Sequence, residues 1–152
     1  MDFDLSSQQQ EVRARAARMA REIVAPRAAQ IDREARYPQD IFEAFRDEGL
    51  LGLAFPVELG GSGAGSLGLA LAIEEVAKYC SASGLLLLTT RLATAAIEMA
   101  GTSHQREHYV RGVAEGRLRG AFALTEPEAG SDAASISTTA RREDDEYVLN
   151  GV

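Results

Sequence analysis

The spacing of the apolar residues changes once along this 152-residue chain, at Gly120, and that change constrains the fold more than any other feature. Before Gly120, apolar side chains recur every three or four residues, which is the spacing of α-helices that bury one face. After it, short β-branched or alternating segments are separated by charged or glycine-containing turns, as in β-strands. We therefore predict a mainly α fold, in which residues 1–119 form an α-helical amino-terminal domain and residues 120–152 begin a β domain.

Serine caps, prolines and glycines delimit the first two expected helices. Ser6 with Gln9, or the pair one residue later, offers a capping box. Pro26 bends or ends this helix, although the apolar pattern resumes as far as residue 31. Pro38 suits the first turn of the second helix, which stops at Gly49.

Three further helices are expected. The third covers about residues 67–79, the fourth opens at Ser81 or Ser83, and a fifth runs to about residue 113 from a capping box formed by Thr102 and Gln105. The apolar faces are expected to consist of Val12, Ala16, Met19, Ile23, Ile41, Phe42, Phe45, Leu71, Ala72, Val76, Tyr79, residues 85–88, Leu92, Ala96 and Met99.

Three short strands are expected after Gly120, at residues 121–124, 135–142 and 147–149. Asn150-Gly151 is a favoured two-residue hairpin turn, which requires a following strand. Strands without partners would leave hydrogen-bonding edges and an apolar face uncovered. We therefore expect the chain to be the first part of a longer protein and inactive by itself.

The composition argues against several classes of function. The net charge of -7 and the lack of a basic run make a nucleic-acid partner unexpected. Cys80 is the only cysteine, so no intramolecular disulfide is expected. The acidic residues at the start do not match a signal peptide, and apolar stretches such as 85–88 are too short to span a membrane. We expect a soluble, cytoplasmic protein.

Residues 63–68 match G-x-G-x-x-G, a pattern that binds dinucleotides when it joins a strand to a helix. Here Pro56 separates the glycines from the candidate strand before them, residues 50–55. No acidic residue closes the second candidate strand, residues 85–90, to hold a ribose. We favour a glycine-rich connection between helices.

Residues 104–108 match H-x-x-E-H, in which two histidines on one helix face bind zinc and the glutamate acts as a base. A third ligand should come from another helix, but the downstream acidic residues lie mostly in loops and turns. We favour an exposed polar helix and predict no metal site.

The segment 122–132 is the strongest candidate site. The strand before it delivers a loop with hydroxyl groups at Thr125 and Ser131. Gly130 permits unusual backbone angles, so the amides around Ser131 could form an anion-binding nest. Pro127 stiffens the loop. Such a loop suits a phosphate or the polar edge of a ring.

Three acidic side chains in this loop, Glu126, Glu128 and Asp132, leave other interpretations open. They could hold a metal or form a carboxylate pair, and their spacing decides neither. Composition alone favours an ordinary turn over a binding site.

The loop closely resembles the flavin-binding signature of the acyl-CoA dehydrogenases. The resemblance covers all 152 residues and rests on residues 125–127 (Thr-Glu-Pro), 129–132 (Ala-Gly-Ser-Asp), 37–38, 49–50, 56–63 and 147–151. Glu128 departs from it, because many members have glycine there. The resemblance implies an amino-terminal helical domain, a middle β domain and a carboxy-terminal helical bundle, assembled as a homotetramer.

The resemblance also implies roles for residues of the loop. Phe122 to Thr125 would lie along the ring of FAD, with Leu124 contributing backbone contacts and Thr125 its hydroxyl near the reactive nitrogen. Ser131, after Gly130, would bind the flavin pyrophosphate or the pantetheine of the substrate through its hydroxyl and amide groups.

The fourth helix, from residue 86 to 99, would help to wall the acyl pocket by the same resemblance. Its candidate substrate-binding residues are Thr89, Thr90, Ala93 and Ala96. A helix of small and apolar residues is more often simply part of a core.

The implied reaction is the α,β-dehydrogenation of an acyl-CoA in fatty acid metabolism. A carboxylate would remove the α proton, the β hydrogen would leave as hydride to the flavin, and an electron-transfer flavoprotein would accept the electrons. No catalytic residue is assigned here, because the usual glutamate base of the family lies beyond Val152. The alternatives are a related flavin monooxygenase or acyl-CoA oxidase, or a non-catalytic half-subunit completed by a partner chain.

Overall fold

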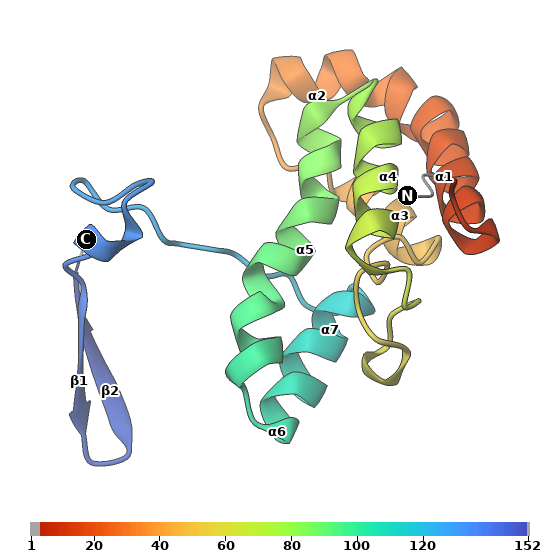
Figure 1. Ribbon diagram of the computed structural model, residues 1–152. Helices are drawn as coiled ribbons and strands as arrows, with labels where there is room; N and C mark the ends of the chain where they lie inside the picture. The colour runs from red at the N-terminus through yellow and green to blue at the C-terminus, as the bar shows by residue number, and fades with distance from the viewer. Residues whose placement is uncertain (1–3, 152) are drawn as a thin grey trace. The chain divides into compact units, whose positions relative to one another are not determined.

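The computed structural model describes residues 4–151 and divides into two compact units, one running to Ala121 and the other starting at Phe122 (Figure 1). The first unit is helical and the second holds a two-stranded antiparallel sheet. The mainly α fold followed by the first strands of a β part is confirmed. Within the described residues, no helix is both long and apolar enough to cross a membrane.

A nearly continuous helical segment opens the first unit. It comprises α1 (Ser7–Met19), the π-helical turn η1 (Ala20–Val24), the 3-10 turn η2 (Ala25–Arg27) and α2 (Ala28–Glu34), and it curves as it passes Pro26 (Figure 1). The predicted capping box is confirmed, because the Ser6 hydroxyl accepts from the Gln9 amide while the Gln9 side chain accepts from the Ser6 amide. The proline tightens the helix without ending it, and the segment stops where Ala35 adopts the left-handed conformation.

The π-helical turn corrects one expected core position. A π-helical turn closes hydrogen bonds over five residues instead of four, so it shifts the buried face by one residue. Ile23, four residues after the buried Met19, is 40% exposed, whereas Val24 is fully buried in its place.

Three helices complete the main core: α3 (Gln39–Asp47), α4 (Gly65–Ala77) and α5 (Ser81–Ala100). Helix α4 packs between α1 and α5 (Figure 1). The buried cluster includes the predicted Val12, Ala16, Met19, Ile41, Phe42, Phe45, Ala72 and Val76, with residues 50, 51 and 53 from the connection after α3. Each fully buried large apolar side chain contributes about 1.5–3 kcal/mol relative to exposure, so this cluster holds the unit together.

Five other side chains expected on apolar faces are exposed, and one of them is Ala96 of α5. Tyr79 is 46% exposed because α4 ends at Ala77 and the chain then turns. Leu85, Leu92 and Met99 are spaced by seven residues and therefore share one face of α5, while the buried face of that helix carries Leu86, Leu87, Thr90 and Thr94.

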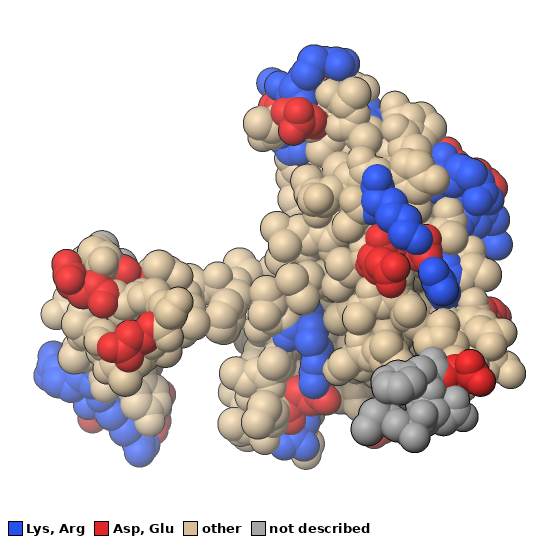
Figure 2. All heavy atoms as spheres, turned by 45° about the horizontal axis from the view of Figure 1, so that its top comes forward, with Lys and Arg blue, Asp and Glu red and all other residues tan. Residues whose placement is uncertain are grey.

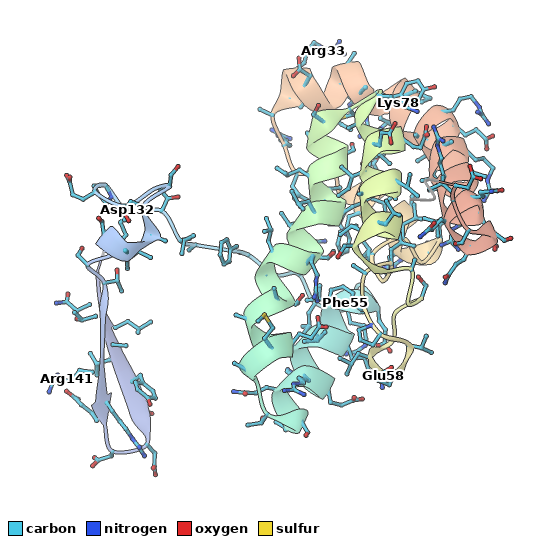
Figure 3. All side chains as sticks on the ribbon, viewed as in Figure 1. Arg33, Phe55, Glu58, Lys78, Asp132 and Arg141 are labelled. Carbon is cyan, nitrogen blue, oxygen red and sulfur yellow. The ribbon has the colours of Figure 1, made fainter. Side chains whose placement is uncertain are left out.

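A smaller cluster lies under the connection between α3 and α4, which includes the 3-10 turn η3 (Val57–Leu59). There Phe55 packs on Val110, Val113 and Ala114 (Figure 3). These partners belong to the last helical segment, made of α6 (Ser103–Gln105), η4 (Arg106–Val110) and α7 (Arg111–Ala114). The capping box of Thr102 and Gln105 is confirmed at its start.

A buried carboxylate, that of Glu75, forms ion pairs that join two helices of the first unit. The Glu75 carboxylate accepts from Arg13 Nε at 2.8 Å and from Lys78 Nζ at 2.6 Å, which ties α1 to α4 and lowers the pKa of Glu75. On the face shown in Figure 2, acidic and basic side chains are interspersed, without a large region of one sign.

The second unit holds one hairpin, in which β1 (Thr139–Glu143) pairs with β2 (Glu146–Asn150) from Thr139 opposite Asn150 to Glu143 opposite Glu146. The 3-10 turn η5 (Ala133–Ser135) delays the start of β1, which was expected at residue 135. The strand expected at residues 121–124 is wrong: this segment has no strand partner and is exposed. The strand expected after Gly151 lies outside the described residues.

Gly61 provides a test of packing in the connection between α3 and α4. An added Cβ there would lie 2.1 Å from the carbonyl oxygen of Phe55, which is backbone and therefore not free to move aside. We expect Gly61→Ala to lower the free energy of unfolding by about 1–3 kcal/mol, measured by urea denaturation. Gly130→Ala is the control, because an added Cβ there meets nothing within 4 Å. Equal unfolding midpoints for the two variants would contradict this packing.

Candidate cofactor-binding loop

The segment from Glu126 to Thr138 forms a closed loop before β1. The Glu126 amide donates to the Ala129 carbonyl at 2.9 Å, and the Ala129 amide donates back at 3.2 Å, which makes a tight turn around Pro127. Ala129 is only 2% exposed and is the one buried apolar residue among the described residues of the second unit. The loop therefore depends on hydrogen bonds more than on apolar packing.

The Glu126 carboxylate is the centre of these hydrogen bonds. Its Oε2 accepts from the Ser137 amide at 2.8 Å and from the Ser137 hydroxyl at 2.9 Å, and its Oε1 accepts from the Thr138 amide at 3.1 Å. Hydrogen bonding from the Thr138 side chain, and then from the Ser137 amide, lowers the pKa of Glu126 from 4.5 to about 2. The side chain is thus a charged structural bridge across the loop.

Asp132 has a similar local role (Figure 3). Its carboxylate accepts from the Ala134 amide at 3.2 Å and from the Ser135 hydroxyl at 2.6 Å, and so caps η5. Glu126 and Asp132 are both engaged by donors of the loop itself, which argues against the carboxylate pair left open by the sequence. Among residues 4–151, no group of three or more ligand-type side chains is placed to hold a metal.

A hollow of about 420 Å³ lies beside the loop. Both apolar and polar side chains line it. The lining residues are Ala123, Leu124, Thr125, Glu126, Ile136, Thr138, Leu149 and Gly151. Two predicted cofactor residues, Leu124 and Thr125, thus meet at one concave surface. Phe122, Gly130 and Ser131 are exposed outside this lining.

The backbone at Gly130 differs from the expectation. Positive φ angles occur at five other glycines among the described residues, but Gly130 is not one of them. An anion nest requires successive residues of alternating helical hand, and the conformation predicted at Gly130 for this purpose is absent. Ser131 presents an exposed hydroxyl instead.

Three of the four substrate candidates, Thr89, Ala93 and Ala96, share one face of α5, whereas Thr90 lies on the buried face. Thr90 is buried and its hydroxyl donates to the Leu87 carbonyl at 2.7 Å, so it serves the core. Ala93 is half-buried and packs closely on Gly120. A Cβ added to Gly120 would lie only 2.2 Å from Ala93 Cβ. Thr89 is half-buried and Ala96 is exposed. Their roles toward a ligand remain predictions.

The other two motifs have ordinary structural roles. In the glycine motif, Gly63 and Gly65 take positive φ angles at the start of α4. Gly68, within the helix, lies against Ala64, which precedes the helix. The preceding turn is 3-10, so the strand that a dinucleotide site requires is lacking in this part of the chain.

In the histidine motif, the rings of His104 and His108 are stacked with centroids 6.3 Å apart on an exposed helical segment. Glu107, the base of the zinc interpretation, forms an ion pair with Arg111 at 2.5 Å. The arrangement supports the exposed polar helix that we favoured.

Comparison with known proteins agrees with this fold. The family described as "Acyl-CoA dehydrogenase, N-terminal domain" matches residues 6–117. The chain belongs to the acyl-CoA dehydrogenase family. The resemblance inferred from the Thr-Glu-Pro and Ala-Gly-Ser-Asp segments is therefore confirmed.

Three similar proteins illustrate the range of the family. Acryloyl-CoA reductase (NADH) of Anaerotignum propionicum is 42% identical over 153 residues, which cover 99% of this chain and 39% of that protein. Butyryl-CoA dehydrogenase from Megasphaera elsdenii matches with a TM-score of 0.89 at 35% identity, over 99% of this chain and 41% of the other. A chain in a structure concerning the electron transferring flavoprotein of Acidaminococcus fermentans and flavin-based electron bifurcation matches with a TM-score of 0.93 at 38% identity, over 99% and 40%.

The chain spans about two fifths of the length of the curated relatives that it matches. The family is thus established, while the activity of the whole protein is a matter for proposal.

Sequence reasoning missed the bridging role of Glu126. The available signal was an acidic residue followed, eleven and twelve positions later, by Ser137 and Thr138 before a strand. Such a long-range pairing has no fixed sequence spacing, so only the folded loop reveals it.

The low pKa of Glu126 predicts how the loop responds to acid. Because the pKa is lower in the folded loop than the ordinary 4.5, the stabilisation is complete above about pH 4.5 and is lost as the pH falls toward 2. We expect a carboxyl titration by NMR to give a pKa of about 2 for Glu126, and a higher value in Ser137→Ala, which removes one donor. Titration of Glu126 near 4.5 in the folded protein would contradict the bridge.

Proposed function

We propose that this chain forms the amino-terminal part of an FAD-dependent acyl-CoA dehydrogenase, which converts an acyl-CoA thioester to its enoyl-CoA. The observation that carries the proposal is the Thr-Glu-Pro loop, held in one shape by Glu126 and placing Thr125 beside a concave surface. Membership of the acyl-CoA dehydrogenase family supports the same chemistry.

The residues at the loop suit a flavin. The hollow combines apolar side chains, Leu124, Ile136 and Leu149, with the hydroxyl-bearing Thr125. A flavin ring has apolar faces and a polar edge, and cofactor sites of this kind join an apolar lining to a few placed polar groups. We propose that Leu124 and Thr125 hold the ring edge, and that the exposed Ser131 binds a phosphate or the pantetheine.

The protein supplies binding and orientation in this proposal. FAD, when bound, would supply the acceptor for the hydride that leaves the β carbon. The proton at the α carbon requires a base, and no residue of this chain is assigned to that role. Glu126 is unsuited to it, because its charge is engaged by three donors and its pKa of about 2 makes it a weak base at neutral pH.

The substrate and partners follow from the same proposal. Thr89 and Ala96, on the less buried side of α5, are our candidates for the wall of the acyl pocket. We propose an electron-transfer flavoprotein as electron acceptor, a homotetramer as assembly and a cytoplasmic location. The similarity to a chain from a study of an electron transferring flavoprotein supports the choice of acceptor.

The reverse reaction is the second candidate. A relative of 42% identity is named for the reduction of acryloyl-CoA with NADH. Dehydrogenation of an acyl-CoA and reduction of an enoyl-CoA change the same bond, that between the α and β carbons. The loop and α5 therefore suit either reaction. Oxygen as acceptor, as in an acyl-CoA oxidase or a flavin monooxygenase, and a non-catalytic half-subunit completed by a partner chain remain the alternatives.

The cofactor proposal predicts a yellow protein. We expect the protein purified from its natural gene to show a flavin absorption band that bleaches when acyl-CoA is added without oxygen. Rapid consumption of oxygen with peroxide formation would favour the oxidase alternative, and bleaching by NADH with return of colour on adding enoyl-CoA would favour the reductase. A colourless protein that does not take up FAD would contradict the proposal.

The pocket proposal predicts a change in substrate preference. We expect Ala96→Leu to reduce kcat/KM for long acyl-CoA substrates about tenfold or more relative to short ones. The larger side chain would occupy space in the pocket that a long acyl group needs. Ala70→Leu is the matched control, since Ala70 is an exposed alanine on α4. If kcat/KM depends on acyl length in the same way in both variants and in the wild type, Ala96 does not line the pocket.

A further inference from the structure

Glu126 joins two segments that lie far apart in the sequence. Ser137 and Thr138 are eleven and twelve residues further along the chain, and their two amides and one hydroxyl all donate to this carboxylate. Both carboxylate oxygens are used, at distances between 2.8 and 3.1 Å. Bonds of this charge-assisted kind are stronger and more directional than those between neutral groups.

The two segments that Glu126 joins both contribute to the lining of one hollow. Residues 123–126 contribute one part and residues 136 and 138 another. Thr125, the proposed flavin contact, is the immediate neighbour of Glu126, and Thr138 immediately precedes β1. The carboxylate therefore sets the distance between Thr125 and the hairpin.

Little else among the described residues of this unit could set that distance. Its apolar side chains are mostly exposed, including Phe122 at 55%, Leu124 at 43% and Leu149 at 71%. The Asp132 bonds are local, since they reach only two and three residues ahead.

We infer that Glu126 is a positioning residue of the cofactor site, whose ionised carboxylate holds Thr125 and the lining residues Ile136 and Thr138 in the arrangement that receives the flavin. The inference rests on the proposed function, and it assigns to this residue a role distinct from that of base, metal ligand or direct cofactor contact.

The test compares Glu126→Gln with Glu128→Gln in the protein from its natural gene. A carboxamide replaces one accepting oxygen by an NH2 donor. Because both oxygens of Glu126 accept from N–H groups, either orientation of the amide sets a donor against a donor. Glu128 lies in the same turn with an exposed side chain, so its substitution controls for the loss of one charge.

Two readouts separate the bridge from its effect on the cofactor. Hydrogen exchange of the Ser137 and Thr138 amides reports the bridge without any flavin. The dissociation constant for FAD, and the visible circular dichroism of the bound flavin at saturation, report the geometry of the site. Thermal melting of the helical unit, which does not contain Glu126, shows that the rest of the chain is intact.

We expect Glu126→Gln to increase exchange of both amides at least tenfold, to weaken FAD binding at least tenfold and to alter the dichroism of the bound flavin, while Glu128→Gln resembles the wild type. Unchanged amide exchange in Glu126→Gln would overturn the bridge. Faster exchange with unchanged FAD affinity and dichroism would overturn the positioning role. A wild-type protein that takes up no FAD would overturn the proposed function and this role with it, whereas amide exchange would still decide whether the bridge exists.

Discussion

The second unit has almost no apolar core, and this constraint explains most of its structure. Ala129 is its one buried apolar residue among those described, whereas the helical unit buries a large cluster. A two-stranded hairpin is at best marginally stable alone. The order of the loop therefore rests on polar contacts, and the Glu126 carboxylate supplies the contacts that reach farthest along the sequence.

The helical unit obtains its order in another way. Helix α4 packs on both α1 and α5, so one continuous cluster of buried side chains joins helices from the start and the middle of the unit. Side-chain hydrogen bonds add to this packing at helix ends, as in the capping boxes of Ser6 and Thr102. The candidate pocket residues Thr89 and Ala96 consequently lie on a helix whose opposite side is fixed by apolar packing.

Local signals account for what the sequence predicted well. A capping box involves residues three apart, and the α3 face of Ile41, Phe42 and Phe45 repeats within one helix, so both can be inferred without knowing the fold. The failures have non-local causes. Ile23 was misplaced because a π-helical turn shifted the buried face, and residues 121–124 were predicted as a strand although pairing depends on a partner. The candidate site was predicted from its Thr-Glu-Pro and Ala-Gly-Ser-Asp motifs, but the bridge from Glu126 to Ser137 and Thr138 was not.

The candidate sites on α5 and in the loop should respond differently to pH and to substitution, because apolar packing holds the first and a charged hydrogen-bonded side chain holds the second. Buried apolar contacts change little with pH or salt, so the α5 surface should respond mainly to substitutions that leave cavities or overfill the core. The loop at Glu126 depends on an ionised group held by N–H and O–H donors, and its geometry therefore varies with the charge of a single side chain. A cofactor site built on such a loop is shaped without apolar burial, which leaves Leu124 and Thr125 exposed for contact with a ligand.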